Sequence, residues 1–159
     1  MKDRILLVLG TLWALPITLV CIWYALACWA LGWYRFIGWR QRALVWCHSG
    51  KPMAGWMTNL WKGWDGHSMG SLVVVRKDPS ESDNAARMLT HELEHTRQAN
   101  ILGVFHPVVY GMVYVSLKLL GDKNVHPYYD NPFEVAARRE AKQPIDIWGV
   151  MLKIRNAKK

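Results

Sequence analysis

The stretch Leu89-Thr90-His91-Glu92-Leu93-Glu94-His95-Thr96-Arg97-Gln98 carries the strongest prediction of both fold and chemistry in this sequence. It follows Ser82 and Asp83, either of which can cap a helix, and it precedes the helix-ending residues Gly103 and Pro107. We therefore predict a helix from about residue 84 to residue 99. Residues four apart lie on one face of a helix, so the imidazoles of His91 and His95 can reach a single metal ion.

Glu92 directly follows the first histidine and would project beside the metal rather than into its coordination shell. In that position a carboxylate can take a proton from metal-bound water, whose pKa zinc lowers to about 7. The spacing therefore predicts Glu92 as a general base.

Two histidines leave a zinc site incomplete, so a third protein ligand is needed. A metzincin would place it at position 101 with glycine at position 98, and Ile101 and Gln98 exclude that arrangement. Glu134 is the better candidate. Asn131 can cap a second helix and Pro132 suits its first position, which places Glu134 in the first turn.

These motifs resemble those of the gluzincin zinc peptidases, and among them a group of short bacterial and phage zincin-like domains. The resemblance covers roughly residues 65–141 and is carried by residues 66–75, residues 89–98 and the Asn-Pro-Phe-Glu sequence at 131–134. It implies Zn²⁺ bound by His91, His95 and Glu134, with Glu92 as the base in peptide-bond hydrolysis. It also implies an oxyanion stabiliser, for which three residues near the third ligand are candidates: His126, Tyr128 and Tyr129.

The N-terminal region contains an uncharged run from Ile5 to Tyr34. As a helix at about 1.5 Å per residue it exceeds the roughly 30 Å of a bilayer's hydrocarbon core, and the run is too short for two spans. It is also too long for a cleavable signal peptide and has no clear cleavage site. We expect residues 1–34 to form one retained, tilted transmembrane anchor, in which Pro16 is tolerated.

Residues 35–64 carry five positive charges and no acidic residue, and six tryptophans lie between Trp33 and Trp64. Tryptophan and basic residues favour the boundary between water and lipid, so we predict an interfacial segment that includes an amphipathic helix. The alternative is that Trp56, Trp61 and Trp64 pack in the core of the following domain. The net charge of +8 does not indicate nucleic-acid binding, because the basic residues do not form an Arg/Lys tract with interleaved aromatics.

The remaining segment, residues 65–159, is expected to be a small zincin-like domain of the α+β class, with a short sheet and two ligand-bearing helices. Residues 71–76 are rich in β-branched side chains and predict a buried strand. We expect His67 on the surface, with a position lining the cleft as the alternative. Glu94 is expected to be solvated or paired with Arg97 or Arg138, and the apolar stretch 101–120 to be a core helix or a helix lying on the membrane.

Three functional classes are compatible with this pattern. The favoured class is a membrane-anchored zinc metallopeptidase acting on a protein or peptide near the membrane. The second is a catalytically silent zinc-binding adaptor, and the third is a small phage-type membrane-active or lysis-related protein. We expect a single-pass protein of the bacterial inner membrane. The excess of basic residues after the apolar run favours a cytoplasmic position for its C-terminal domain.

Overall fold

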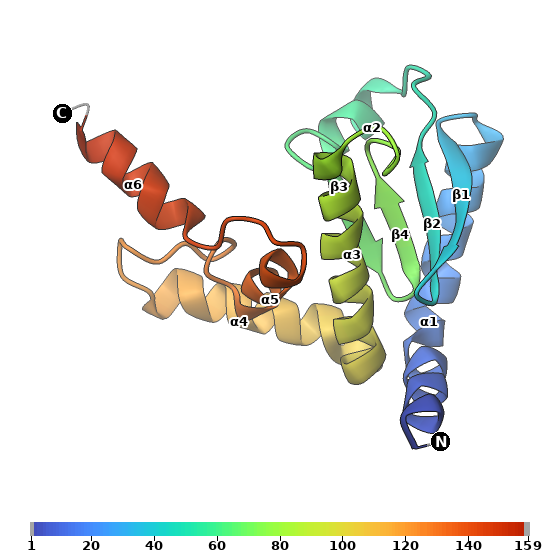
Figure 1. Ribbon diagram of the computed structural model, residues 1–159, viewed down its shortest axis with the longest axis horizontal. Helices are drawn as coiled ribbons and strands as arrows, with labels where there is room; N and C mark the ends of the chain where they lie inside the picture. Colours follow the sequence, from blue (N-terminus) through green and yellow to red (C-terminus); the bar gives the residue numbers. More distant parts are fainter. Residues whose placement is uncertain (1, 158–159) are drawn as a thin grey trace.

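A four-stranded sheet lies between two long helices in the N-terminal two-thirds of the chain (Figure 1). The computed structural model describes residues 2–157, and burial is described for residues 8–154; Met1 of the expected anchor and residues 158–159 lie outside it. The strands are β1 (Tyr34–Arg40), β2 (Ala43–His48), β3 (Gly66–Met69) and β4 (Leu72–Val75). The helices are α1 (Lys2–Ala30), α2 (Gly55–Leu60), α3 (Asp83–Leu102), the 3₁₀ helix η1 (Gly103–Phe105), α4 (His106–Leu120), α5 (Pro132–Glu140) and α6 (Ile147–Ala157). The chain is therefore α+β.

The strand order β1-β2-β4-β3 leaves β3 at one edge of the sheet. Two antiparallel hairpins, β1–β2 and β3–β4, are joined by parallel pairing of β2 with β4. Gln41 and Arg42 turn the first hairpin with left-handed backbone conformations, φ 43° and 73°. Gly70 turns the second with φ 60°, a conformation that glycine adopts without strain.

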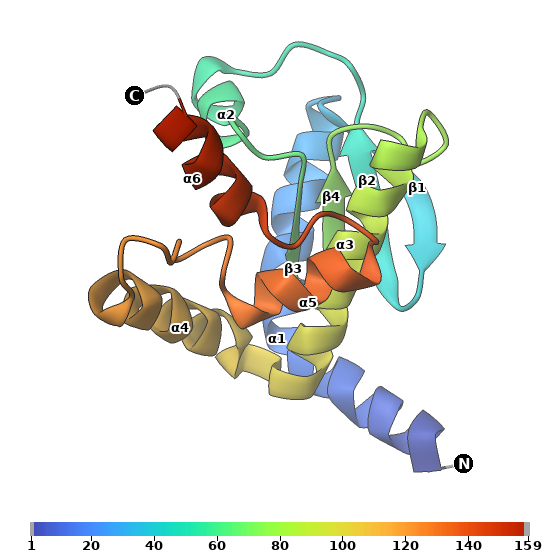
Figure 2. The same ribbon diagram turned by 60° about the vertical axis from the view of Figure 1, so that its left-hand side comes forward.

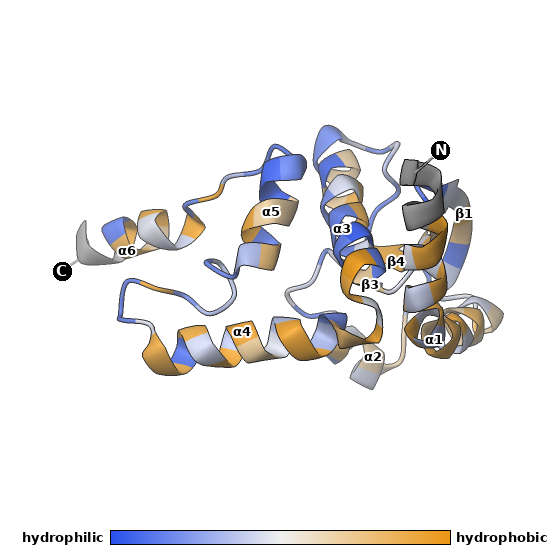
Figure 3. Ribbon diagram, turned by 90° about the horizontal axis from the view of Figure 1, so that it is seen from below, coloured by the Kyte–Doolittle hydropathy of each residue, from blue (hydrophilic) through white to orange (hydrophobic). Residues whose placement is uncertain are grey.

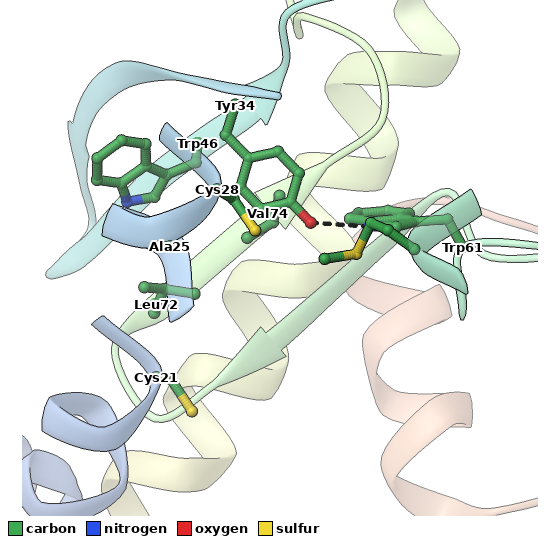
Figure 4. Close-up of a cluster of buried hydrophobic side chains, with 9 residues drawn as sticks. Cys21, Ala25, Cys28, Tyr34, Trp46, Trp61, Leu72 and Val74 are labelled. Atoms are coloured by element: carbon green, nitrogen blue, oxygen red, sulfur yellow. Dashed lines mark hydrogen bonds between the residues drawn. The ribbon is translucent and has the colours of Figure 1, made fainter. Parts of the chain in front are cut away.

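The two faces of the sheet carry alternate residues of the same strands. Val45, Cys47, Val73 and Val75 are buried on the face that α3 covers through Met88, Leu89 and Leu93. On the opposite face, Tyr34, Trp46, Leu72 and Val74 pack with Cys21, Ala25 and Cys28 of α1 (Figure 4). Successive side chains of β2 and β4 point to opposite faces of the sheet, so the two strands contribute to two apolar layers. One layer packs against α1 and the other against α3.

Helix α1 belongs to this fold as well as being a candidate membrane segment. It is one helix from Lys2 to Ala30 that includes Pro16, as predicted. Its stripe of buried residues faces the sheet and consists of Ala14, Thr18, Cys21, Ala25 and Cys28. The Thr18 hydroxyl donates to Ala14 O (2.9 Å) and accepts from the amide of Ser71 (2.8 Å), which fastens α1 to the β3–β4 turn.

The prediction of an amphipathic helix within residues 35–64 is wrong for most of that segment. Residues 34–48 form β1 and β2, and these strands share a sheet with β3 and β4, so the sheet extends across the boundary expected at residue 65. Trp46 and Trp61 are buried in the core, and the indole Nε1 of Trp61 donates to the hydroxyl of Tyr34 (2.8 Å; Figure 4). Trp39, Trp56 and Trp64 are exposed.

Beyond α3, helices α4 and α6 lie to one side of the sheet, whereas α5 lies across α3 (Figure 2). No residue of α4 is buried, so the core-helix alternative for residues 101–120 is wrong for this helix. By length and composition, two helical segments among the described residues could cross a membrane: Val8–Ala30 and Asp83–Leu120. The second is interrupted by η1, and its apolar portion is the C-terminal part.

Candidate metal centre

Three buried side chains converge where α3 meets α5. His91 Nε2 and His95 Nε2 lie 3.2 Å apart. Glu134 Oε2 is 3.4 Å from His91 Nε2, and Glu134 Oε1 is 3.3 Å from His95 Nε2. The sequence predicted a convergence within about 4 Å, and the structure brings the three side chains together at that range. This buried group could hold a metal ion.

The local sequence explains why these side chains point to one place. The Ser82 hydroxyl caps α3 by accepting from the amide of Ala85 (3.2 Å), one of the two alternatives predicted. The Asn131 side chain caps α5 by accepting from the amide of Phe133 (3.1 Å), with Pro132 in the first turn. Because α5 begins at this point, its first turn, which contains Glu134, faces the side of α3 that carries His91 and His95.

Both histidines have their second ring nitrogen bonded to a glutamine side-chain oxygen. Nδ1 of His91 lies 3.0 Å from Gln143 Oε1, and Nδ1 of His95 lies 2.8 Å from Gln98 Oε1. An amide oxygen only accepts, so Nδ1 carries a proton in each ring. In the neutral form of the ring, which metal binding requires, the free lone pair is then on Nε2 and points at the shared position, whereas in the protonated form Nε2 donates to Glu134. Gln98 Nε2 also donates to Phe133 O (3.0 Å), which links α3 to α5.

The carboxylate of Glu134 is held from two further directions. The Tyr110 hydroxyl of α4 donates to Oε1 (2.9 Å), and the buried Arg138 guanidinium lies 3.4 Å from Oε2. Burial alone would raise the pKa of Glu134, but hydrogen bonds from His91 and His95 hold it well below its usual range. The Glu134 side chain is therefore a carboxylate at neutral pH, which is the form that binds a metal ion.

The electrostatics of the group favour a bound cation. Burial opposes protonation of His95, yet its hydrogen bond to Glu134 raises its pKa above the ordinary value. The ligand atoms thus occupy a position where positive charge is stabilised. Two imidazole nitrogens and one carboxylate oxygen, each oriented by a second hydrogen bond, form a donor set that a divalent metal ion, zinc among others, accepts.

Glu92 lies beside this group. It is buried, and burial raises the pKa of its carboxyl group, an effect that the charges of His95 and His91 oppose. The Ser68 hydroxyl of β3 hydrogen-bonds to it. β3 passes so close that a Cβ on Gly66 would meet Glu92 Oε1 at 2.8 Å and Cγ at 2.9 Å. Glu92 is therefore fixed between α3 and the edge strand.

A cavity of about 630 Å³ opens onto these side chains. The edge strand β3 lines one side with residues 66–69, and α4 lines another with His106, Pro107, Tyr110 and Tyr114. His91, Glu92, His95 and Glu134 all reach it. The cavity has the size of an ordinary ligand pocket and leaves the candidate metal centre accessible to a ligand.

Of the three candidate oxyanion stabilisers, Tyr128 alone lines the cavity. The His126 ring instead accepts from the backbone amides of Tyr128 and Tyr129 (3.2 Å each) and packs against Trp148. Tyr129 packs against the His126 ring, and its backbone carbonyl accepts a hydrogen bond from the Arg138 guanidinium. The structure thus places Tyr128 at the candidate site and directs His126 and Tyr129 elsewhere.

Several residues of the cavity were not predicted from the sequence, among them Tyr110 and Tyr114. Tyr110 and Tyr114 lie within an apolar stretch that shows no pattern of a binding site, although their four-residue spacing places them on one helical face. His67 lines the cavity, which was the alternative to the surface position expected for it, and burial lowers its pKa to about 4. Glu94 is buried and paired with Arg97 (2.7 Å), one of the two partners expected, and is not a solvated charge.

Comparison with protein-family models, with curated proteins and with solved structures found no match.

Proposed function

We propose that this protein is a membrane-attached, zinc-dependent metallopeptidase. The observation that carries the proposal is the position of Glu92: it lies beside the His91–His95–Glu134 group, inside the same cavity, without belonging to the ligand set. A metal site that only stabilises a fold has no use for a buried carboxylate next to an open cavity. A hydrolase needs a base in that place.

The chain's own residues support such a reaction. A zinc ion bound here would supply an acidified water and polarise the carbonyl of the substrate. Glu92 would accept the proton of the attacking water. Its pKa, raised by burial, also suits it to pass that proton to the leaving amine. Ser68 and the tight packing of Gly66 hold the carboxylate in position.

The substrate would lie along β3. This strand is the edge of the sheet and lines the cavity, so its unpaired backbone groups can bind an extended peptide by strand addition. Tyr128, which lines the same cavity, is the candidate donor to the oxyanion. Helix α1, whose outward face exposes apolar side chains from Val8 to Trp29, is the candidate anchor.

The test compares the full-length protein with Glu92→Gln, after purification in detergent and measurement of bound metal. We expect the wild type to hold one zinc ion and to cleave an unfolded protein substrate. Glu92→Gln should keep the zinc and lose about 10²- to 10⁴-fold in turnover, because it keeps the shape and loses the proton acceptor.

Glu94→Gln is the matched control. It makes the same change two residues away, at a side chain that pairs with Arg97 and does not line the cavity. Zinc binding without cleavage in the wild type would favour a silent adaptor, and absence of zinc would favour a membrane-active protein without a metal. Equal activity in wild type and Glu92→Gln would refute the mechanism.

A further inference from the structure

A continuous apolar surface covers the end of α3, η1 and α4. Eight large apolar side chains there are exposed, which we call the α4 face: Ile101, Val104, Phe105, Val108, Met112, Val115, Leu119 and Leu120. Leu119 is 75% exposed and Met112 is 65% exposed. Monomeric soluble proteins rarely leave so many large apolar side chains together in water, and such patches usually mark a partner or a membrane.

The α4 face joins the apolar surface of α1. The rings of Trp13 and Phe105 pack with centroids 6.0 Å apart. Gly103 lies directly against the Trp13 indole and leaves no room for a Cβ. On α1 itself, Val8, Leu9 and Leu12 are exposed. Seen from below, α4 and α1 both carry hydrophobic segments, drawn in orange (Figure 3). A membrane that receives α1 therefore meets the α4 face as well.

The charge pattern favours lipid as the occupant of this surface. Between Ile101 and Gly121 the one charged residue is Lys118, which is exposed near the end of α4. A lysine at a helix end can extend its amine to the headgroups while its aliphatic stem stays in apolar surroundings. A protein partner of ordinary composition would usually be met by a polar rim around the apolar patch, whereas this surface continues directly into a candidate span.

The two faces of α4 have different surroundings. His106, Pro107, Tyr110 and Tyr114 line the cavity of the candidate metal centre. Val108, Met112, Val115 and Leu119, at spacings of three or four residues, point outward. A single helix thus separates the cavity from the apolar exterior.

We propose that the α4 face lies in the boundary between headgroups and acyl chains, and that the cavity takes its polypeptide from the membrane. The substrate class is then an apolar segment of a membrane-bound polypeptide, cleaved where it leaves the bilayer. The substrate part of this proposal rests on the proposed peptidase function, whereas the position of α4 does not.

The position of α4 is tested in liposomes with the full-length protein. Val115→Cys and Leu119→Cys are labelled with an environment-sensitive fluorophore, and Glu81→Cys, exposed at the opposite end of α3, is the control. The native cysteines at 21, 28 and 47 are buried, so the unsubstituted protein gives the background. We expect nitroxide-bearing lipids to quench positions 115 and 119 several-fold more than position 81, and iodide to do the reverse.

Iodide quenching of positions 115 and 119 equal to that of position 81 would overturn the membrane position. Protection from both quenchers would overturn it too, because it would mean that a second copy of the chain covers the α4 face.

The substrate class is tested with Leu119→Glu, which places a charge on the α4 face, and with Lys123→Glu as the control outside it. We expect the Leu119→Glu variant to cleave a short soluble peptide at the wild-type rate. Its rate on a membrane-inserted substrate should be at least about tenfold below that of the wild type. Equal cleavage of the inserted substrate would overturn the substrate class. A wild type that cleaves neither would overturn the peptidase function, while the quenching result would still decide where α4 lies.

Discussion

Replacing Gly66 by alanine would test whether the edge strand fixes the candidate base. The new Cβ would lie 2.8 Å from Glu92 Oε1, 2.9 Å from Cγ and 3.1 Å from Cδ, whereas ordinary contact starts near 3.4 Å. The two groups must therefore separate by roughly half an ångström. The clash includes Cγ, so rotation of the carboxylate alone cannot relieve it, and either α3 or β3 must shift.

The expected loss follows from that displacement. A misplacement of about 1 Å at a reacting group can cost about 10²-fold in rate, so half of it should cost about tenfold in kcat. Overpacking should lower the free energy of unfolding by about 1–3 kcal/mol. Bound zinc should be unchanged, because the crowded side chain is not a ligand.

The measurements are zinc content, thermal unfolding and steady-state cleavage. Gly55→Ala is the control, since a Cβ there meets no atom within 4 Å. Wild-type kcat in Gly66→Ala would refute the idea that β3 holds Glu92 in position.

Three further outcomes are expected. Tyr110→Phe removes the hydroxyl that donates to Glu134 Oε1 and should weaken zinc binding about 10- to 100-fold by chelator competition, with α4 otherwise unaffected; unchanged affinity would contradict that role. Deleting residues 2–30 should abolish cooperative unfolding in circular dichroism, because it uncovers the sheet face that α1 buries; a truncated chain with a sharp transition would contradict this. Burial lowers the pKa of His67 to about 4 in the folded protein, so unfolding free energy should fall as pH decreases from about 6.5 toward 4, and His67→Phe should show a smaller fall in urea titrations; parallel curves would count against it.

Much of the candidate centre could be predicted because its signals are local. The spacing of His91 and His95, the Ser82 cap and the Asn-Pro start of α5 each act within one or two turns of helix. Tertiary packing had only to bring the two helices together. Tyr110 and Gln143 could not be predicted as partners of the ligands, since nothing near them in the sequence distinguishes them from other tyrosines and glutamines.

The role of α1 in the fold was harder to predict, because apolar composition is the same whether a helix faces lipid or a protein core. A signal was nevertheless present. Ala14, Thr18, Cys21, Ala25 and Cys28 are all small, and they recur at alternating spacings of four and three. Small residues on one stripe allow close packing against the sheet, while the large apolar residues occupy the outer face.

The β1–β2 hairpin was missed for two physical reasons. Its turn, Gln41-Arg42, lacks the glycine or asparagine that usually accompanies left-handed backbone conformations. Its tryptophans also suggested a lipid boundary, although Trp46 faces α1 in the core. Alternation in Ala43, Val45 and Cys47 was the evidence for a strand.

The order of the ligands along the chain has a consequence for biosynthesis. During translation α1 and the sheet emerge first, and the histidines of α3 follow long before Glu134 and Gln143. The nascent chain therefore carries an incomplete ligand set, without the third ligand and without the partner of His91 Nδ1, until α5 has been made. On the proposed function, a ribosome-bound chain that ends before residue 131 should bind zinc weakly and show no hydrolysis, so activity would begin only after α1 and the sheet have been made.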